Sequence, residues 1–85
     1  MNFTLHFTRR AERGLERLGA TDRKRVDVAL LLLTENPRPS GAAVFKGLEN
    51  AYRIRVGKCR IVYQVQDERL VIVVIAIGYR KDVYR

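Results

Sequence analysis

The sequence predicts an α+β fold in which two N-terminal helices pack on one face of a four-stranded, mostly antiparallel sheet. Three patterns carry this prediction. Residues 8–36 repeat apolar side chains at helical spacing, residues 52–65 alternate apolar with basic or polar side chains as strands do, and residues 70–77 form a continuous aliphatic run. A chain of 85 residues is long enough for one modest core, so we expect a single domain over residues 1–85.

The chain opens with a predicted half-buried strand. Phe3, Leu5 and Phe7 alternate with polar residues, which places the three apolar side chains on one face. His6, the only histidine, points to the opposite face. We interpret it as a surface residue, because its neighbours in the sequence are neutral and polar.

The first helix is expected to begin after Thr8, a good N-cap, and to end near Gly19. Its inward stripe is Ala11, Leu15 and Leu18. The arginines on its remaining surface alternate with glutamates in the sequence. We interpret this surface as an ordinary solvated face, with contact to a nucleic acid as the alternative.

The second helix is expected to restart at Thr21-Asp22 and to end at Asn36-Pro37. Its inward residues are Val26, Ala29, Leu30 and Leu33. Leu31 and Leu32 widen the apolar surface beyond that stripe, either for burial between helix and sheet or as a patch for a partner. We expect them to be buried in the core.

The central feature is a predicted hairpin in the stretch AYRIRVGKCRIVYQV, residues 51–65, with its turn at Gly57-Lys58. Strand alternation places Arg53, Arg55 and Arg60 together on the outward face. Three fixed positive charges at strand spacing repel one another, and a polyanion lying over them removes that repulsion. A solvated strand face is an equally weighted alternative on this hairpin alone.

Further basic residues extend the predicted surface. Lys46 follows a loop of Pro, Ser and Gly residues and precedes the hairpin. Residues 79–85, YRKDVYR, combine aromatic rings with cations, a composition suited to stacking on bases while holding phosphates. A frayed basic tail is the alternative. The candidate nucleic-acid-binding residues are Lys46, Arg53, Arg55, Lys58, Tyr79, Lys81 and Arg85.

Composition narrows the class of function. The net charge of +8 favours a polyanionic or acidic partner. Cys59 is the only cysteine, so no intrachain disulfide and no Cys-based metal cluster is expected, which fits a reducing cytoplasm. No segment is apolar and long enough to suggest a membrane span or a secretion signal. The few acids and the single histidine show no metal-ligand spacing, so we expect no cofactor.

Over essentially its whole length, the chain resembles the RelE/ParE superfamily of small bacterial and archaeal toxins, on the RelE-like side. The resemblance rests on the order of elements, on the link VFKGLENAYRIRVGKCRIVYQV and on the ending IGYRKDVYR. It implies a RelE-like toxin of a type II toxin–antitoxin system, a ribosome-dependent endoribonuclease that cleaves mRNA in the ribosomal A site. It also implies an acidic, RelB-like antitoxin as partner, in a toxin–antitoxin hetero-oligomer.

The resemblance also implies site residues. The family's central basic positions fall on Arg53, Arg55 and Arg60, and its late arginine and near-terminal tyrosine fall on Arg80 and Tyr84. Arg60, Arg80 and Tyr84 are therefore the expected catalytic residues. Attack by the RNA's own 2′-hydroxyl needs no metal, only a proton acceptor, charge stabilisation and a proton donor. Many relatives have a histidine where this chain has Tyr79, which leaves open the acid–base role of that position.

The sequence is also compatible with two alternative functions. One is a ParE-like inhibitor of DNA gyrase that is not an enzyme, and the other is an inactive RelE-like binding protein. The pair of Arg80 and Tyr84 favours the nuclease, because ParE-like chains generally lack it.

Overall fold

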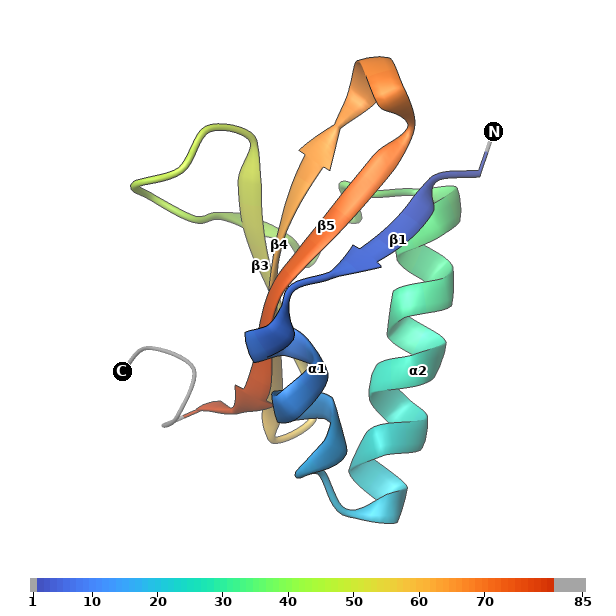
Figure 1. Ribbon diagram of the computed structural model, residues 1–85, viewed down its shortest axis with the longest axis vertical. Helices are drawn as coiled ribbons and strands as arrows, with labels where there is room; N and C mark the ends of the chain where they lie inside the picture. The colour runs from blue at the N-terminus through green and yellow to red at the C-terminus, as the bar shows by residue number, and fades with distance from the viewer. Residues whose placement is uncertain (1, 81–85) are drawn as a thin grey trace.

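The computed structural model describes residues 2–80 and confirms the α+β class. Within this range a five-stranded sheet carries two helices (Figure 1). The elements are β1 (Thr4–Phe7), α1 (Arg9–Glu16), α2 (Ala20–Glu35), β2 (Ala43–Val44), β3 (Ala51–Val56), β4 (Cys59–Gln66), the short 3₁₀ turn η1 (Asp67–Arg69) and β5 (Val71–Tyr79). The helix boundaries differ slightly from the prediction, because Gly19 caps the start of α2 instead of ending α1.

The strand order is β1-β5-β4-β3-β2, with β1 parallel to β5 and every other pair antiparallel. The sequence predicted four strands. The fifth, β2, is only two residues long and pairs with Arg53 and Tyr52 of β3, so it carries almost no periodicity for a sequence pattern to reveal.

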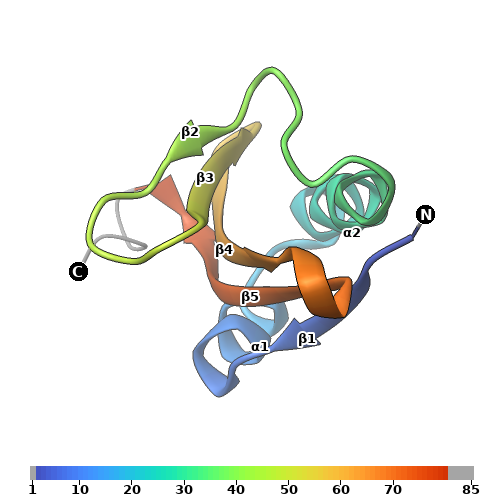
Figure 2. The same cartoon turned by 90° about the horizontal axis from the view of Figure 1, so that it is seen from above.

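The main core lies between the helices and the sheet. Val26, Leu30 and Leu33 of α2 meet the inward residues of β4 and β5, and Ala11 and Leu18 complete the cluster from the α1 side. Figure 2 shows α2 on one side of the sheet and α1 beside β5, close to the end of β1. The predicted inward stripes of both helices are therefore confirmed.

The prediction that Leu31 and Leu32 are buried is wrong. Leu31 is 64% exposed, Leu32 is 62% exposed and Val28 is 58% exposed. Leu31 and Leu32 lie three and four residues after Val28, so the three side chains share one face of α2, and that face is turned away from the sheet. Because α2 packs on the sheet by one side only, its opposite side forms an apolar stripe in solvent, which we call the α2 stripe.

The first helix closes an open edge of the sheet. β1 pairs with Val71–Val74 only, so among the described residues 2–80 the second half of β5 has no strand neighbour on that side. Thr8 fixes the start of α1 there: its amide donates to the Val74 carbonyl (3.0 Å), and its hydroxyl donates to the Ile75 carbonyl (2.7 Å). The same hydroxyl accepts the Ala11 amide, the predicted N-cap (3.1 Å). A helix laid along this edge shields the unpaired backbone of β5.

Gly14 allows α1 to approach β5 closely. A Cβ built at this position would overlap the carbonyl oxygen of Ile77, a backbone atom of the strand. Any other residue would therefore force α1 away from β5. The requirement here is for space, because the neighbouring atom cannot rotate aside as a side chain would.

A cluster around Arg38 ties the loop after α2 to the sheet. The Arg38 guanidinium donates to both carboxylate oxygens of Asp67 (3.0 and 2.8 Å) and to the Tyr52 hydroxyl (2.8 Å). The Tyr63 hydroxyl donates to the Pro37 carbonyl (2.7 Å). Burial raises the pKa of Tyr63 to about 12, and the hydrogen bonds from Arg38 lower the pKa of Asp67. The sequence pattern did not predict this cluster.

No helix within residues 2–80 has the length and apolar character needed to span a membrane.

Candidate nucleic-acid interface

The β3–β4 hairpin forms as predicted and brings its arginines together. A two-residue turn at Gly57 and Lys58 joins the strands, and Gly57 adopts a φ of 58°, which glycine accommodates most readily. Arg53, Arg55 and Arg60 line a hollow of about 230 Å³ on the outer face, which we call the hairpin hollow. Gly41, Ala43 and Ile54 complete its walls.

The register places like charges opposite each other in this hollow. The Cα atoms of Arg55 and Arg60 are direct cross-strand partners. Such a pair is unfavourable by roughly 0.2–1 kcal/mol, unless a counter-ion lies between the two side chains. Neither Arg53 nor Arg55 forms an ion pair with any residue in the range 2–80. The hairpin hollow therefore suits a bound anion, and phosphate matches the fork geometry of guanidinium groups.

The backbone of Arg80 lies beside the same hairpin. Its amide donates to the carbonyl of Lys58 (3.0 Å), which continues the pairing of β5 with β4 past the end of the strand. Two residues earlier, Gly78 is the cross-strand partner of Arg60. Arg80 and Lys58 are both exposed, so these two cations lie at the turn end of the hairpin.

Tyr79 has its hydroxyl engaged in the fold. The hydroxyl accepts the Gly19 amide (3.2 Å) and donates to the Asp22 carboxylate (3.0 Å), and the ring packs against the main core. These contacts hold the joint between α1 and α2 against the end of β5.

Lys46 is exposed in the loop before the hairpin. The preceding residue, Phe45, packs on Val62 and Ala76 of the outer face, and its amide donates to the Ala51 carbonyl (2.9 Å). This anchor keeps Lys46 next to the sheet. Lys81, Tyr84 and Arg85 lie outside the described residues, so their predicted roles remain predictions.

The chain's only thiol and its only imidazole are far apart. Cys59 is buried, and burial raises the pKa of its thiol. His6 is exposed on β1, where it pairs with Val73, whereas Cys59 pairs with Tyr79 at the opposite end of β5. Within residues 2–80, no three His, Cys, Asp or Glu side chains gather at a point where they would hold a metal ion.

A second basic cluster lies on α1. Arg9, Arg10, Arg13 and Arg17 line a pocket of about 350 Å³ together with residues of the second half of β5. The prediction of an ordinary solvated face did not include a pocket at these arginines. The sequence did hold a signal, because arginines recur at positions 9, 13 and 17 whereas glutamates recur at 12 and 16. A spacing of four keeps each set on its own side of a helix.

Known proteins share both the sequence and the fold of this chain. Residues 5–84 match the family described as ParE toxin of type II toxin-antitoxin system, parDE. The mRNA interferase toxin RelE of Escherichia coli strain K12 is 35% identical over 83 residues, which cover 95% of this chain and 86% of the relative. Toxin RelG of Mycobacterium tuberculosis is 29% identical over 86 residues, which cover 100% of this chain and 99% of the relative.

The fold agrees with these sequence matches. In the crystal structure of the intact E. coli RelBE toxin-antitoxin complex, one chain superposes with a TM-score of 0.80 at 33% identity. The superposition covers 91% of this chain and 95% of that chain. This chain therefore belongs to the RelE/ParE superfamily and is a RelE-like toxin of a type II toxin–antitoxin system.

Proposed function

We propose that this toxin is an endoribonuclease that cleaves mRNA in the ribosomal A site and thereby inhibits translation. The observation that carries the proposal is the hairpin hollow, in which Arg53, Arg55 and Arg60 meet and the first two have no acidic partner among residues 2–80. The name of the E. coli relative, an mRNA interferase toxin, supports the same activity.

In the proposed reaction, the 2′-hydroxyl of the RNA attacks the adjacent phosphate. Arg53 and Arg55 hold that phosphate, while Arg60 and Arg80 stabilise the charge that develops on it. Tyr84 accepts the proton of the 2′-hydroxyl, and nearby guanidinium groups favour its phenolate form. Arg80 also helps to protonate the leaving oxygen. No metal or cofactor takes part.

The remaining basic residues have docking roles in this proposal. Lys46, Lys58, Lys81 and Arg85 contact RNA phosphates around the cleavage site. Tyr79 has a structural role at the edge of the site, because its hydroxyl is already hydrogen-bonded to Gly19 and Asp22. Weak intrinsic acid–base groups make activity dependent on the ribosome, since correct positioning of the mRNA compensates for a poor base.

An acidic antitoxin is the proposed partner, in a toxin–antitoxin hetero-oligomer. The net charge of +8 favours an acidic protein, and the α2 stripe offers the apolar surface that an amphipathic segment requires. The similar E. coli chain comes from a complex with its antitoxin, which supports the same kind of partner here.

The test is translation in a purified system, followed by sequencing of the RNA ends. We expect cuts within the A-site codon that depend on the ribosome, persist with a chelator and leave a 5′-hydroxyl beside a 2′,3′-cyclic phosphate or its hydrolysis product. Intact mRNA at toxin concentrations that exceed the ribosomes would refute the nuclease. A supercoiling assay with DNA gyrase then tests the ParE-like alternative.

A further inference from the structure

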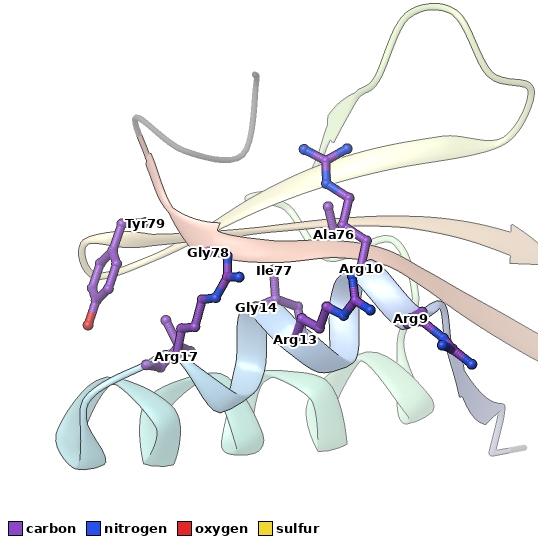
Figure 3. Close-up of a pocket in the computed structure, with 10 residues that line it drawn as sticks. Arg9, Arg10, Arg13, Gly14, Arg17, Ala76, Ile77, Gly78 and Tyr79 are labelled. Atoms are coloured by element: carbon purple, nitrogen blue, oxygen red, sulfur yellow. The ribbon is translucent and has the colours of Figure 1, made fainter.

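The pocket on α1 combines strong positive charge with a floor of strand backbone. Figure 3 shows Arg10 and Arg17 extending from α1 toward β5, with Tyr79 beyond one end of the helix. The floor consists of residues 76–79 of β5, and Gly14 keeps α1 close to that strand. We call this site the α1 pocket.

Three of the four arginines in the α1 pocket have no acidic partner in the described part of the chain. Arg9, Arg13 and Arg17 form no ion pair with any residue from 2 to 80. Glu12 and Glu16 line a separate depression with Arg23, on another side of α1. The helix is therefore divided into a basic side and an acidic side, and its basic side is open to an external anion.

The α1 pocket is a neighbour of the hairpin hollow. Its floor includes Gly78, the cross-strand partner of Arg60, and Arg60 in turn pairs with Arg55 in the hollow. Adjacent strands lie about 4.8 Å apart, so only the width of β4 and β5 separates the two sites. An extended polyanion that occupies the hairpin hollow and continues across β4 and β5 reaches the α1 arginines.

We propose that the α1 pocket binds backbone phosphates of the single-stranded RNA that occupies the hairpin hollow. This inference rests on the proposed function for the nature of the polyanion. A protein partner fits less well, because the fully buried core of a protein–protein interface is more apolar than the rest of the protein surface. The large exposed apolar residues, such as Leu31, Leu32 and Val44, do not line this pocket. The α1 pocket thus holds the same RNA strand at a second point, away from the cleaved bond.

The test measures binding of the free toxin to a single-stranded uridine oligonucleotide over a range of salt concentrations. Each phosphate contact contributes about 0.7 to the slope of log affinity against log salt for single strands. The Arg13→Gln/Arg17→Gln protein should therefore lose about 1.4 of that slope. The matched control, Arg23→Gln/Lys24→Gln, removes the same charge from α2 outside the pocket and should change the slope much less.

A second variant separates loss of phosphate contacts from loss of folding. Arg13→Lys/Arg17→Lys keeps both cations and should keep the slope, and circular dichroism should show the same helix content in all proteins. An equal loss of slope in the α2 control would overturn the proposal, since net charge alone would then explain the binding. So would an unchanged RNA slope with weakened binding of a polyglutamate peptide, which would make the pocket an acidic-peptide site.

This measurement is independent of cleavage. If the proposed nuclease activity fails, wild-type toxin leaves ribosome-bound mRNA intact, yet the salt slopes still report on the α1 pocket. If only the α1 pocket fails, wild-type toxin cleaves mRNA and the Arg13→Gln/Arg17→Gln protein binds RNA with an unchanged slope.

Discussion

Replacing Gly14 by alanine should destabilise the protein, although the same change in an ordinary helix is stabilising. Alanine is favoured over glycine inside a helix by about 0.8–1.0 kcal/mol. At Gly14, however, the added Cβ would overlap the Ile77 carbonyl oxygen. The strand at that point is part of the sheet and cannot yield as a flexible side chain would, so α1 must move outward.

The expected magnitude follows from overpacking. Forcing an extra methyl group into a tightly packed contact typically destabilises by about 1–3 kcal/mol, more than alanine's helix preference gains. The outward movement also withdraws Ala11 and Leu18 from the main core, both of which are buried. We therefore expect a net loss of free energy of unfolding, measured as a lower urea midpoint with an unchanged slope.

Gly41→Ala is the matched control. A Cβ at Gly41 meets no atom within 4 Å, and the residue lies in an exposed loop. This change should leave the urea midpoint nearly constant or raise it slightly, because alanine restricts the unfolded chain. An unchanged or higher midpoint for Gly14→Ala would refute the close contact between α1 and β5.

Three further predictions test the core, the buried tyrosine and the site. In urea unfolding, Leu31→Gln/Leu32→Gln should change the free energy of unfolding by no more than about 0.5 kcal/mol per site, whereas Leu30→Ala should lower it by about 2–5 kcal/mol. A large loss from the double variant would mean that the α2 stripe is buried. The pKa of Tyr63 is raised to about 12 in the folded state, so the unfolded state releases this proton first as pH rises. Stability should therefore fall between about pH 10 and 12, by at most about 1.4 kcal/mol per pH unit. Tyr63→Phe should show a shallower fall, and a pH profile identical to that of the wild type would contradict the assignment. Arg80→Ala should slow single-turnover cleavage on programmed ribosomes by about 10²–10³-fold with little change in ribosome binding, and an equal loss of binding would argue for a docking role instead.

The elements that the sequence predicted well are those whose pattern repeats. Alternation over Ala51–Val56 and Cys59–Gln66 gave the hairpin, its turn and the grouping of Arg53, Arg55 and Arg60, because a two-residue turn leaves only one register. The stripes on α1 and α2 likewise identified the inward residues. Each of these predictions depends only on the geometry of a single strand pair or helix.

The errors arose where tertiary position decides the outcome. Nothing in the sequence of α2 states how much of its circumference the sheet covers, so Leu31 and Leu32 were assigned to the core although their side faces solvent. β2 exists only because Ala43 and Val44 come beside the edge of β3. The α1 pocket has a different cause: arginines and glutamates that alternate along the chain fall on separate sides of α1 once it is helical.

The position of α1 links the stability of the fold to the charge of its surface. A helix as short as Arg9–Glu16 is marginal in isolation, so it depends on the contacts of Thr8, Ala11 and Gly14 with β5 and the core. Those contacts also fix which way the other sides of α1 point, and so they hold Arg13 and Arg17 over the strand that carries the partner of Arg60. Weakening the contact at Gly14 should therefore lower both stability and the salt dependence of RNA binding, whereas Arg13→Gln/Arg17→Gln should lower only the latter. If Gly14→Ala lost stability but kept the full salt slope, the arginines of α1 would act without the floor of β5, and the α1 pocket would not be a defined site.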